Sequence, residues 1–352
     1  PMLEAYHNFS DKVLAYGPSQ GLDIYRQGLV QYYLKNGIAL KESDIIVTTA
    51  GSEAVTFAMM VVCGAGDEII VPEPFYTNYN GFATMAGINI VPITTHAENG
   101  FQLPSTSVIE ETIGAKTKAI MICNPGNPTG TVYGKEEIHR LAEIAKKHGL
   151  YIISDEVYRE FIYDGQTHTS ILSVEGIEEH AIMVDSVSKR YSACGARIGC
   201  IVSRNKELMD ATLKFAQARL CPPTVDQLAA QACTKLGDEY FKEIIDEYQA
   251  RRDVVYSALM EIPGVVCKRP EGAFYVFAKL PIDDAEDFVI WLLDEFQVNG
   301  ETVMGAPAEG FYATPGLGKN EIRLAYIINN DELVKAMEIF KAGIAEYIRI
   351  KS

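Results

Sequence analysis

Short apolar runs alternate with helix-like segments along the first half of the chain. In the segment 135–148, for example, Ile138, Leu141, Ala142 and Ala145 repeat with a helical period. The pattern predicts strands at 45–49, 68–71, 88–91, 118–122, 151–154 and 181–184, with helices at 53–63, 77–85, 107–113 and 135–148. Apolar strands that alternate with helices indicate a mostly parallel sheet covered by helices on both faces.

The last third of the chain has a different pattern. A long helical region at about 222–260 precedes shorter strands at 273–278 and 321–328 and a final helix from Asp331. We therefore expect an α/β fold with a large domain, whose mostly parallel sheet lies between helices, and a smaller α+β domain. The expected divisions are an N-terminal segment at 1–44, interrupted by a Gly/Pro loop at 15–21, a large domain at 45–255 and a small domain at 256–352.

Composition and charge narrow the class of protein. The 352 residues include 47 acidic and 31 basic ones, a net charge of -16, which argues against nucleic acid or an anionic membrane as a partner. No apolar run reaches transmembrane length and no signal peptide is visible, although the chain opens at Pro1 and we expect its natural start to be missing. Seven cysteines without a C-x-x-C pair predict reduced thiols in a cytoplasmic protein. Six histidines without ligand spacing predict no metal site.

The stretch Asp185-Ser186-Val187-Ser188-Lys189-Arg190 follows the strand predicted at 181–184. It lies just past the carboxyl end of a strand, where open α/β sheets bind their ligands. A lysine amine can form a Schiff base with an aldehyde cofactor, and a nearby cation, here Arg197, helps to keep that amine unprotonated. Taken alone, a solvated surface lysine explains the motif better. The loops after the other strands decide between these interpretations.

Two of those loops have features of a ligand-binding site: one offers a site for an anion, and the other presents a fixed amide. Gly51-Ser52-Glu53 begins a helix directly after a strand, and the free N–H groups and positive dipole end of a helix favour a phosphate. A helix N-cap at Ser52 is the alternative. The loop 124–130 contains two prolines and two glycines, which restrict its backbone and present Asn127 as a fixed amide. An ordinary loop is the alternative there.

Two further loops offer a carboxylate and aromatic rings. Asp155 ends a predicted strand, so that its carboxylate could pair with a protonated ring nitrogen, and Tyr158 lies one helical turn further on, where its phenol could bond a ring oxygen. For Asp155 the alternative is again a helix N-cap. Phe75-Tyr76 offers an aromatic face for stacking, with ordinary core packing as the alternative.

Together these motifs resemble the fold type I pyridoxal-phosphate aminotransferases of the aspartate aminotransferase superfamily (classes I and II). The resemblance runs from Tyr16 to Arg323 and so covers nearly the whole chain. Each motif is moderately specific, and their combination in this order is highly specific. The motifs are Asn127-Pro128-Thr129-Gly130, Asp155-Glu156-Val157-Tyr158, Ser186-Val187-Ser188-Lys189 and Gly195-Ala196-Arg197-Ile198-Gly199.

The resemblance implies roles around a pyridoxal 5'-phosphate cofactor. Three residues are catalytic: Lys189 binds the cofactor covalently, Asp155 pairs with its ring nitrogen and Tyr158 bonds its phenolic oxygen. Asn127 bonds the same oxygen and also lies beside the substrate. Arg323 matches the arginine that binds the substrate's α-carboxylate, for which a bidentate guanidinium is suited. The remaining cofactor-binding residues are Tyr76, which stacks on the ring, and, around the phosphate, Gly51, Ser52, Glu53, Ser186, Ser188, Arg197 and Tyr16 from the neighbouring subunit.

The implied activity is transfer of an amino group from an L-amino acid to a 2-oxo acid, in particular 2-oxoglutarate, by a homodimer with shared active sites. One bacterial subgroup of aspartate aminotransferases has a lysine for the distal carboxylate where Ser52 stands, so the preferred amino acid stays open. A carbon–sulfur β-lyase or a related lyase would use the same Lys189, Asp155 and Arg323 and is the alternative. A non-catalytic regulator would need a DNA-binding extension, and a nicotinamide enzyme would need the third glycine that Gly64-Ala65-Gly66 lacks.

Overall fold

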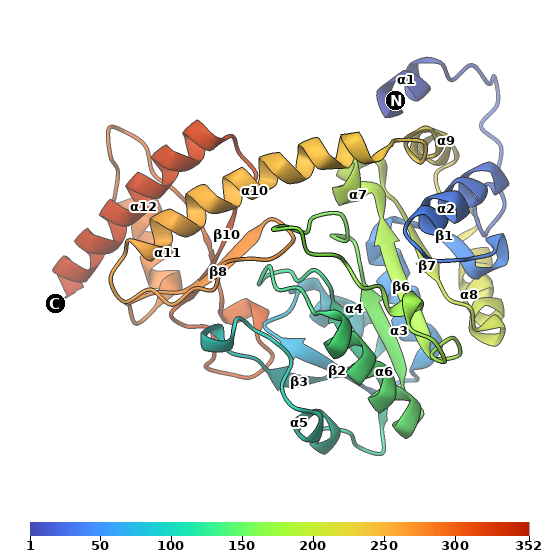
Figure 1. The fold of residues 1–352 in the computed structure, drawn as a ribbon, viewed down its shortest axis with the longest axis horizontal. Coiled ribbons are helices and arrows are strands. Elements are labelled where there is room, and N and C mark those ends of the chain that lie inside the picture. Colours follow the sequence, from blue (N-terminus) through green and yellow to red (C-terminus); the bar gives the residue numbers. More distant parts are fainter. Residues whose placement is uncertain (352) are drawn as a thin grey trace.

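A seven-stranded sheet forms the centre of the larger region of the molecule in the computed structural model, which describes residues 1–351 (Figure 1). The strands lie in the order β1-β7-β6-β5-β4-β2-β3. They are β1 (Ile45–Thr49), β2 (Glu68–Glu73), β3 (Asn89–Thr94), β4 (Thr117–Cys123), β5 (Tyr151–Asp155), β6 (Ala181–Ser186) and β7 (Ile198–Val202).

Five neighbouring strands of this sheet, from β3 to β6, run parallel to one another. The prediction of a mostly parallel sheet between helices is therefore confirmed. Strand β7 is antiparallel to both of its neighbours, β6 and β1, and was not predicted. Residues 187–197 connect β6 to β7 and are too few for a crossover helix, which is why the chain reverses direction here.

Helices cover both faces of the sheet because successive side chains of a buried strand point to opposite faces. On β5, Ile152 belongs to the core beneath α2 (Asp23–Lys35) and α6 (Lys135–His148). The next residue, Ile153, belongs to the core on the other side, beneath α3 (Ala50–Val62). The helices α4 (Asn78–Ala86) and α8 (Lys206–Arg219) pack on the α3 face, and α5 (Thr106–Glu111) packs on the α6 face.

The helical region predicted at 222–260 is two helices, α9 (Thr224–Cys233) and α10 (Asp238–Met260). Gly237 lies between them with an extended backbone and begins α10. Helix α10 runs from the large sheet region toward the C-terminal region (Figure 1). The predicted domain boundary at 255/256 falls inside this continuous helix, and the division into domains stays a prediction.

A three-stranded antiparallel sheet in the order β8-β10-β9 forms the centre of the smaller region. It packs with α10 and two further helices around a second core. This core contains Phe288 and Tyr347, whose rings contact the ring of Trp291. Tyr158 of the large region belongs to this core as well. The remaining elements are β8 (Tyr275–Lys279), β9 (Ala306–Pro307), β10 (Glu321–Ala325), α11 (Ala285–Asp294), α12 (Asn330–Lys351), the N-terminal α1 (Met2–His7), the four-residue α7 (Val187–Arg190) and the 3-10 turns η1 (Glu42–Asp44), η2 (Ala97–Asn99), η3 (Ile171–Ser173), η4 (Cys194–Ala196) and η5 (Glu309–Phe311).

No helix among residues 1–351 is both long enough and apolar enough to cross a membrane.

Candidate active site

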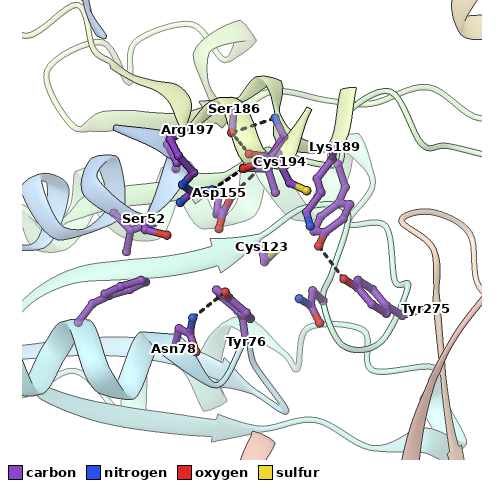
Figure 2. A pocket seen from close by; sticks show the side chains of 18 of the residues that line it. Ser52, Tyr76, Asn78, Cys123, Asp155, Ser186, Lys189, Cys194, Arg197 and Tyr275 are labelled. Carbon is purple, nitrogen blue, oxygen red and sulfur yellow. Dashed lines mark hydrogen bonds between the residues drawn. The ribbon is translucent and has the colours of Figure 1, made fainter. Parts of the chain in front are cut away.

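A cavity of about 430 Å³ opens at the carboxyl ends of the parallel strands, beside the small sheet (Figure 2). Its size is typical of sites that bind small molecules. Eleven of the predicted site residues line it, namely Gly51, Ser52, Tyr76, Asn127, Asp155, Tyr158, Ser186, Ser188, Lys189, Arg197 and, from β10, Arg323. Segments that are far apart in the sequence are thus brought together in one place.

Lys189 lies in α7, directly after β6, as predicted. The hydroxyl of Ser186 begins this helix, because its Oγ accepts a hydrogen bond from the Ser188 N–H at 3.1 Å. The neighbouring Arg190 is fully buried on the other side, where it pairs with Asp185 and Glu160. Since Arg190 fixes the helix from behind, Lys189 faces the cavity. The interpretation of Lys189 as a solvated surface lysine is therefore wrong.

Burial lowers the pKa of the Lys189 amine, and the cations Arg197 and Arg323 act in the same direction. The nearby Asp155 partly opposes this effect. Nζ of Lys189 lies 5.8 Å from the centre of the Tyr158 ring and 5.7 Å from that of Phe274. An amine with a lowered pKa is more often in its neutral form, which is the form that acts as a nucleophile or a base.

Asp155 ends β5 and its side chain is almost completely buried. Burial raises the pKa of its carboxyl from 3.8 to about 6, although two hydrogen bonds oppose the rise. The phenol of Tyr79 donates to Oδ2 at 2.8 Å, and the Val157 N–H donates to Oδ1 at 3.4 Å. Turns instead of a helix follow Asp155, so the alternative of a helix N-cap at this residue is wrong.

The start of α3 forms one end of the cavity. The turn from β1 into α3 lies against β7, where the Ala50 N–H donates to the Arg197 carbonyl at 3.0 Å. Gly199 permits this approach, because a Cβ at that position would come within 2.5 Å of the Ala50 backbone. The next N–H groups, of Gly51 and Ser52, lie in the first turn of α3 and have no carbonyl of a preceding turn to bond. With Arg197 beside them, they form a site suited to an anion.

The side chains of Ser52 and Glu53 differ in what they contact. Ser52 lines the cavity from the first turn of α3, and the N-cap is Thr49, so the alternative of an N-cap at Ser52 is wrong. The Glu53 carboxylate lies outside the cavity lining. It accepts hydrogen bonds from the Thr49 N–H at 2.7 Å and from Nε of Arg219 at 3.2 Å. The side chain of Glu53 is thus paired outside the cavity, and a contact of Glu53 with the cofactor stays a prediction.

The opposite end of the cavity carries Arg323. Its Nη1 donates to Oδ1 of Asn127 at 3.0 Å, and its guanidinium lies over the rings of Tyr275 and Phe311, at 4.7 and 4.9 Å from their centres. Nε of Arg323 is buried and has no hydrogen-bond partner among residues 1–351. A guanidinium with an unpaired, buried N–H is suited to bind a carboxylate.

Phenols line the wall between these ends (Figure 2). The hydroxyls of Tyr158 and Tyr275 lie 3.0 Å apart, and the Tyr76 hydroxyl accepts a hydrogen bond from the Asn78 amide at 2.7 Å. Tyr76 is half-buried and lines the cavity, whereas its neighbour Phe75 is 3% exposed and belongs to the core. Of the predicted aromatic pair, only Tyr76 can therefore reach a ligand.

Residues 3–310 match the family model for aminotransferases of class I and II. The chain belongs to this family. Aspartate aminotransferase of Bacillus subtilis (strain 168) is 32% identical over 342 residues, which are 94% of this chain and 84% of that protein. The predicted resemblance to fold type I pyridoxal-phosphate aminotransferases is thus confirmed, and the chain is an enzyme of this kind.

Solved aminotransferase structures have the same fold. An alanine aminotransferase from Pyrococcus furiosus superimposes with a TM-score of 0.89 at 32% identity, covering 98% of this chain and 88% of that one. An aromatic aminotransferase from Pyrococcus horikoshii OT3 gives a TM-score of 0.88 at 29% identity, covering 98% and 91%. The three relatives are named for three different kinds of amino acid, so the family identifies the reaction class and leaves the preferred amino acid open.

The side chain of Tyr16, like that of Glu53, does not line the cavity of this aminotransferase. It is 82% exposed and lies beside a separate groove formed with Thr49 and residues 221–226. Its neighbours Val13 and Leu14 are also exposed. In this structure Tyr16 does not contact the cavity of its own subunit, and its role in a neighbouring subunit stays a prediction.

The sequence did not reveal several residues that line the aminotransferase cavity or contact its groups. Tyr79 bonds Asp155, Tyr275 bonds Tyr158, and Cys194 accepts a hydrogen bond from Arg197 through its carbonyl at 2.9 Å. The signal for Tyr79 was present, since it lies one helical turn after Tyr76 at the start of α4. Further lining residues are Ala50, Val55, Asn78, Phe82, Cys123 and Val157.

Within residues 1–351, the histidine, cysteine, aspartate and glutamate side chains form no group of three or more that could hold a metal ion.

Proposed function

We propose that this aminotransferase moves the α-amino group of an L-amino acid to a 2-oxo acid, in particular 2-oxoglutarate, with pyridoxal 5'-phosphate bound at Lys189. One observation carries the proposal: an amine, a buried carboxylate and a guanidinium, from Lys189, Asp155 and Arg323, line one cavity. The family membership of the chain supports the reaction class.

The residues of the cavity fit this cofactor. Asp155 is buried and forms no ion pair with a lysine or arginine of residues 1–351, which suits a protonated ring nitrogen as its partner. The N–H groups at the start of α3 and the Arg197 guanidinium suit a phosphate. Asn127 uses its Oδ1 to accept from Arg323, which leaves its amide N–H groups available to a ring oxygen.

Pyridoxal 5'-phosphate, when bound, supplies an aldehyde that takes up the amino group and a ring that takes up the electrons of the Cα–H bond. Lys189 removes the proton from the substrate Cα with its Nζ and later delivers a proton from the same atom. Asp155 accepts a hydrogen bond from the ring nitrogen and keeps it protonated. Arg323 holds the α-carboxylate, so that the Cα–H bond is directed toward Lys189.

The Tyr158 phenol, with Tyr275 as its partner, and the Asn127 amide bond the ring oxygen in this proposal. The side chain of Tyr76 stacks on the ring. The hydroxyl of Ser186 is 3.0 Å from the Ile198 carbonyl and 2.8 Å from the Ser188 hydroxyl, so it already has partners within the chain. We therefore assign the direct contacts with the phosphate to Ser52, Ser188 and Arg197 and to the backbone N–H groups of residues 51 and 52.

We further propose that the enzyme works in the cytoplasm as a homodimer with shared active sites. All seven cysteines are free thiols in the structure, which suits a reducing compartment. The exposed loop that carries Val13, Leu14 and Tyr16 provides an apolar surface for a second subunit. Tyr16 would then reach the phosphate site of the partner.

A panel assay tests the activity. The full-length protein, loaded with pyridoxal 5'-phosphate, is given each L-amino acid together with 2-oxoglutarate, and glutamate is measured. We expect glutamate with at least one amino acid, parallel lines in double-reciprocal plots because the mechanism is ping-pong, and no activity in Lys189→Ala. Release of pyruvate and ammonia without any 2-oxo acid would contradict the proposal and favour the carbon–sulfur β-lyase. Activity only with pyruvate or oxaloacetate as acceptor would overturn the choice of 2-oxoglutarate.

A further inference from the structure

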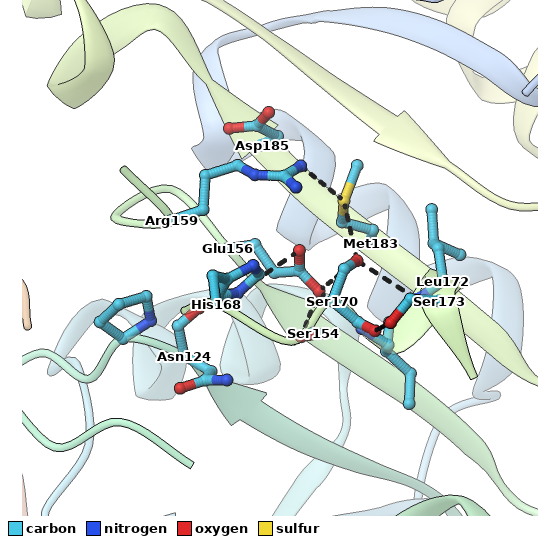
Figure 3. A network of polar contacts seen from close by, with 12 residues as sticks. Asn124, Ser154, Glu156, Arg159, His168, Ser170, Leu172, Ser173, Met183 and Asp185 are labelled. Carbon is cyan, nitrogen blue, oxygen red and sulfur yellow. Dashed lines mark hydrogen bonds and ion pairs between the residues drawn. The ribbon is translucent and has the colours of Figure 1, made fainter. Parts of the chain in front are cut away.

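A buried histidine lies beneath the loop that carries Asn127, outside the lining of the cavity (Figure 3). His168 follows β5 in the chain and precedes η3. Its side chain is 8% exposed, and its Nε2 lies 3.1 Å from the carbonyl oxygen of Asn124. Nothing in the proposed reaction uses this histidine, so its position needs a separate explanation.

The imidazole of His168 is neutral and carries its proton on Nε2. Burial, together with the smaller effect of the Arg159 charge, lowers its pKa from 6.5 to about 3. A neutral imidazole has one N–H, and a carbonyl oxygen can only accept. Nε2 is therefore the donor in the contact with Asn124, while Nδ1 has no hydrogen-bond partner among residues 1–351.

The segment that carries His168 is fixed to the sheet by Glu156. This fully buried carboxyl accepts three hydrogen bonds at its Oε1, each 3.0 Å long, from the Ser154 hydroxyl, the Ser170 hydroxyl and the Ile171 N–H. Its second oxygen lies 3.7 Å from Nε2 of His168. Because Ser154 belongs to β5 and Ser170 lies just after His168, the bonds hold the histidine at a constant place beside the strand that ends in Asp155.

Asn124 connects that strand to the substrate end of the cavity. Its N–H donates to the Asp155 carbonyl at 2.9 Å, and its carbonyl accepts from His168. Three residues later, Asn127 accepts the hydrogen bond from Arg323. The orientation of the peptide after Asn124 thus sets where the loop begins, and the loop sets where the Asn127 amide meets the guanidinium.

We propose that His168 is a positioning residue for the substrate-carboxylate site: its Nε2–H holds the Asn124 carbonyl and thereby fixes Asn127 against Arg323. The inference rests on the proposed function, in which Arg323 binds the α-carboxylate. Without the donor, the buried Asn124 carbonyl loses its partner, and the loop moves to regain one. A small displacement of Asn127 then misaligns Arg323, and small displacements of positioning groups have large effects on ligands.

Two amide substitutions test the position of the donor. In His168→Gln the amide nitrogen can reach the place of Nε2 and keep the hydrogen bond, whereas in His168→Asn it ends one atom short, near the place of Nδ1. His180 provides a matched control. Its Nδ1 lies 2.9 Å from the Leu150 carbonyl, at the amino end of β6 and therefore at the opposite end of the sheet from the cavity. There His180→Asn keeps the donor and His180→Gln displaces it.

The readout is the binding of paired ligands to the holoenzyme, followed by the absorbance of the bound cofactor. L-Phenylalanine is compared with 2-phenylethylamine and L-alanine with ethylamine, since each pair differs only in the α-carboxylate. The affinity of the apoenzyme for pyridoxal 5'-phosphate and the thermal unfolding of each variant are measured beside it, so that loss of folding is recognised.

We expect His168→Asn to reduce the preference for the amino acid over its amine by about tenfold, and His168→Gln to keep most of the preference. Both His180 variants should keep it fully. Equal preference in wild type, His168→Asn and His168→Gln would overturn the inference and leave the proposed function intact. An equal loss of preference in both His168 variants would have the same consequence. So would a loss of similar size in a His180 variant. If His168→Asn does not fold, His168→Gln still decides, because we expect this variant to keep most of the preference and a loss of preference in the folded variant overturns the inference. A wild-type enzyme that shows no preference in either pair would overturn the proposed function together with the inference.

Discussion

The Arg323 guanidinium donates a hydrogen bond to the side chain of Asn127 at 3.0 Å and so joins the small sheet to the loop after β4. The two residues are 196 positions apart in the sequence. Their contact places the cation that we assign to the substrate's α-carboxylate beside an amide that can reach the cofactor ring. One hydrogen bond thus fixes the position of the cavity end that we assign to the substrate carboxylate relative to the end that we assign to the cofactor ring.

This arrangement makes a substitution of Arg323 informative. Arg323→Lys keeps the charge but loses the planar fork, so amino-acid binding should weaken by about 1.5–3 kcal/mol, the scale of a hydrogen bond to a charged group. Affinities of an amino acid and of its decarboxylated amine, measured side by side, check the result. Amines should be little affected, and an equal loss for both would indicate a structural role for Arg323.

Tyr79 controls the charge of Asp155. Its hydroxyl donates to the carboxylate and lowers the pKa of Asp155, which burial holds at about 6. Tyr79→Phe removes this donor, so the pKa should rise, and the acid limb of the profile of kcat/KM against pH should move to higher pH by roughly one unit. Tyr76→Phe is a control, because its hydroxyl bonds Asn78 instead. An unchanged acid limb in Tyr79→Phe would contradict this role.

Asp155 should lower the stability of the cofactor-free enzyme. Its pKa is raised from 3.8 to about 6 in the folded state, so the folded chain binds a proton that the unfolded chain has lost between these values. The free energy of unfolding therefore falls as pH rises through this window, by up to about 3 kcal/mol for this group, and stays lower above it.

In Asp155→Asn, the fall in the free energy of unfolding with rising pH that this carboxyl causes should be absent. Urea unfolding of the two apoenzymes at equal concentration should give similar stabilities near pH 4 and a more stable variant at pH 7.5. With cofactor and substrate, the same variant should be slower by several orders of magnitude, since the protonated ring nitrogen is lost. A variant that turns over at nearly the normal rate, or that is less stable than wild type at pH 7.5, would refute the role of Asp155.

Tyr16 allows a test of shared active sites. One chain carries Lys189→Ala and another carries Tyr16→Ala, and each should be poor or inactive alone. In a hybrid of the two, one site would receive intact copies of both residues and the other would receive neither, so activity should return to about half of wild type. Hybrids that form but stay inactive, although Tyr16→Ala alone is impaired, would show that Tyr16 does not act across the dimer.

The sequence predicted the sheet and some residues of the cavity for a physical reason, whereas Arg323 was predicted only from the family resemblance. Buried parallel strands appear as apolar runs, and ligand-binding residues lie at or just after their carboxyl ends, as Asp155 and Lys189 do. It did not predict β7, because a reversal through the short α7 has no separate hydrophobic period. It also merged α9 with α10, because only the four residues 234–237 separate two patterns of the same kind.

The sequence also did not predict contacts between side chains of distant segments. Nothing near Asp155 in the sequence indicates that Tyr79 bonds it, and nothing near Asn124 indicates His168 as its partner. Both contacts depend on how the elements pack. Glu53 is a further example, since it was predicted beside the cofactor while its side chain turns away from the cavity to Arg219.

The central claim, that Lys189 carries the cofactor, is tested most directly by chemical reduction. The purified protein should be yellow with bound pyridoxal 5'-phosphate, and borohydride should fix the cofactor irreversibly to one lysine. Mass spectrometry of the digested protein then identifies the modified peptide. We predict that it contains Lys189 and that Lys189→Ala gives no such peptide. Stoichiometric labelling of a different lysine in the wild-type enzyme would contradict the account.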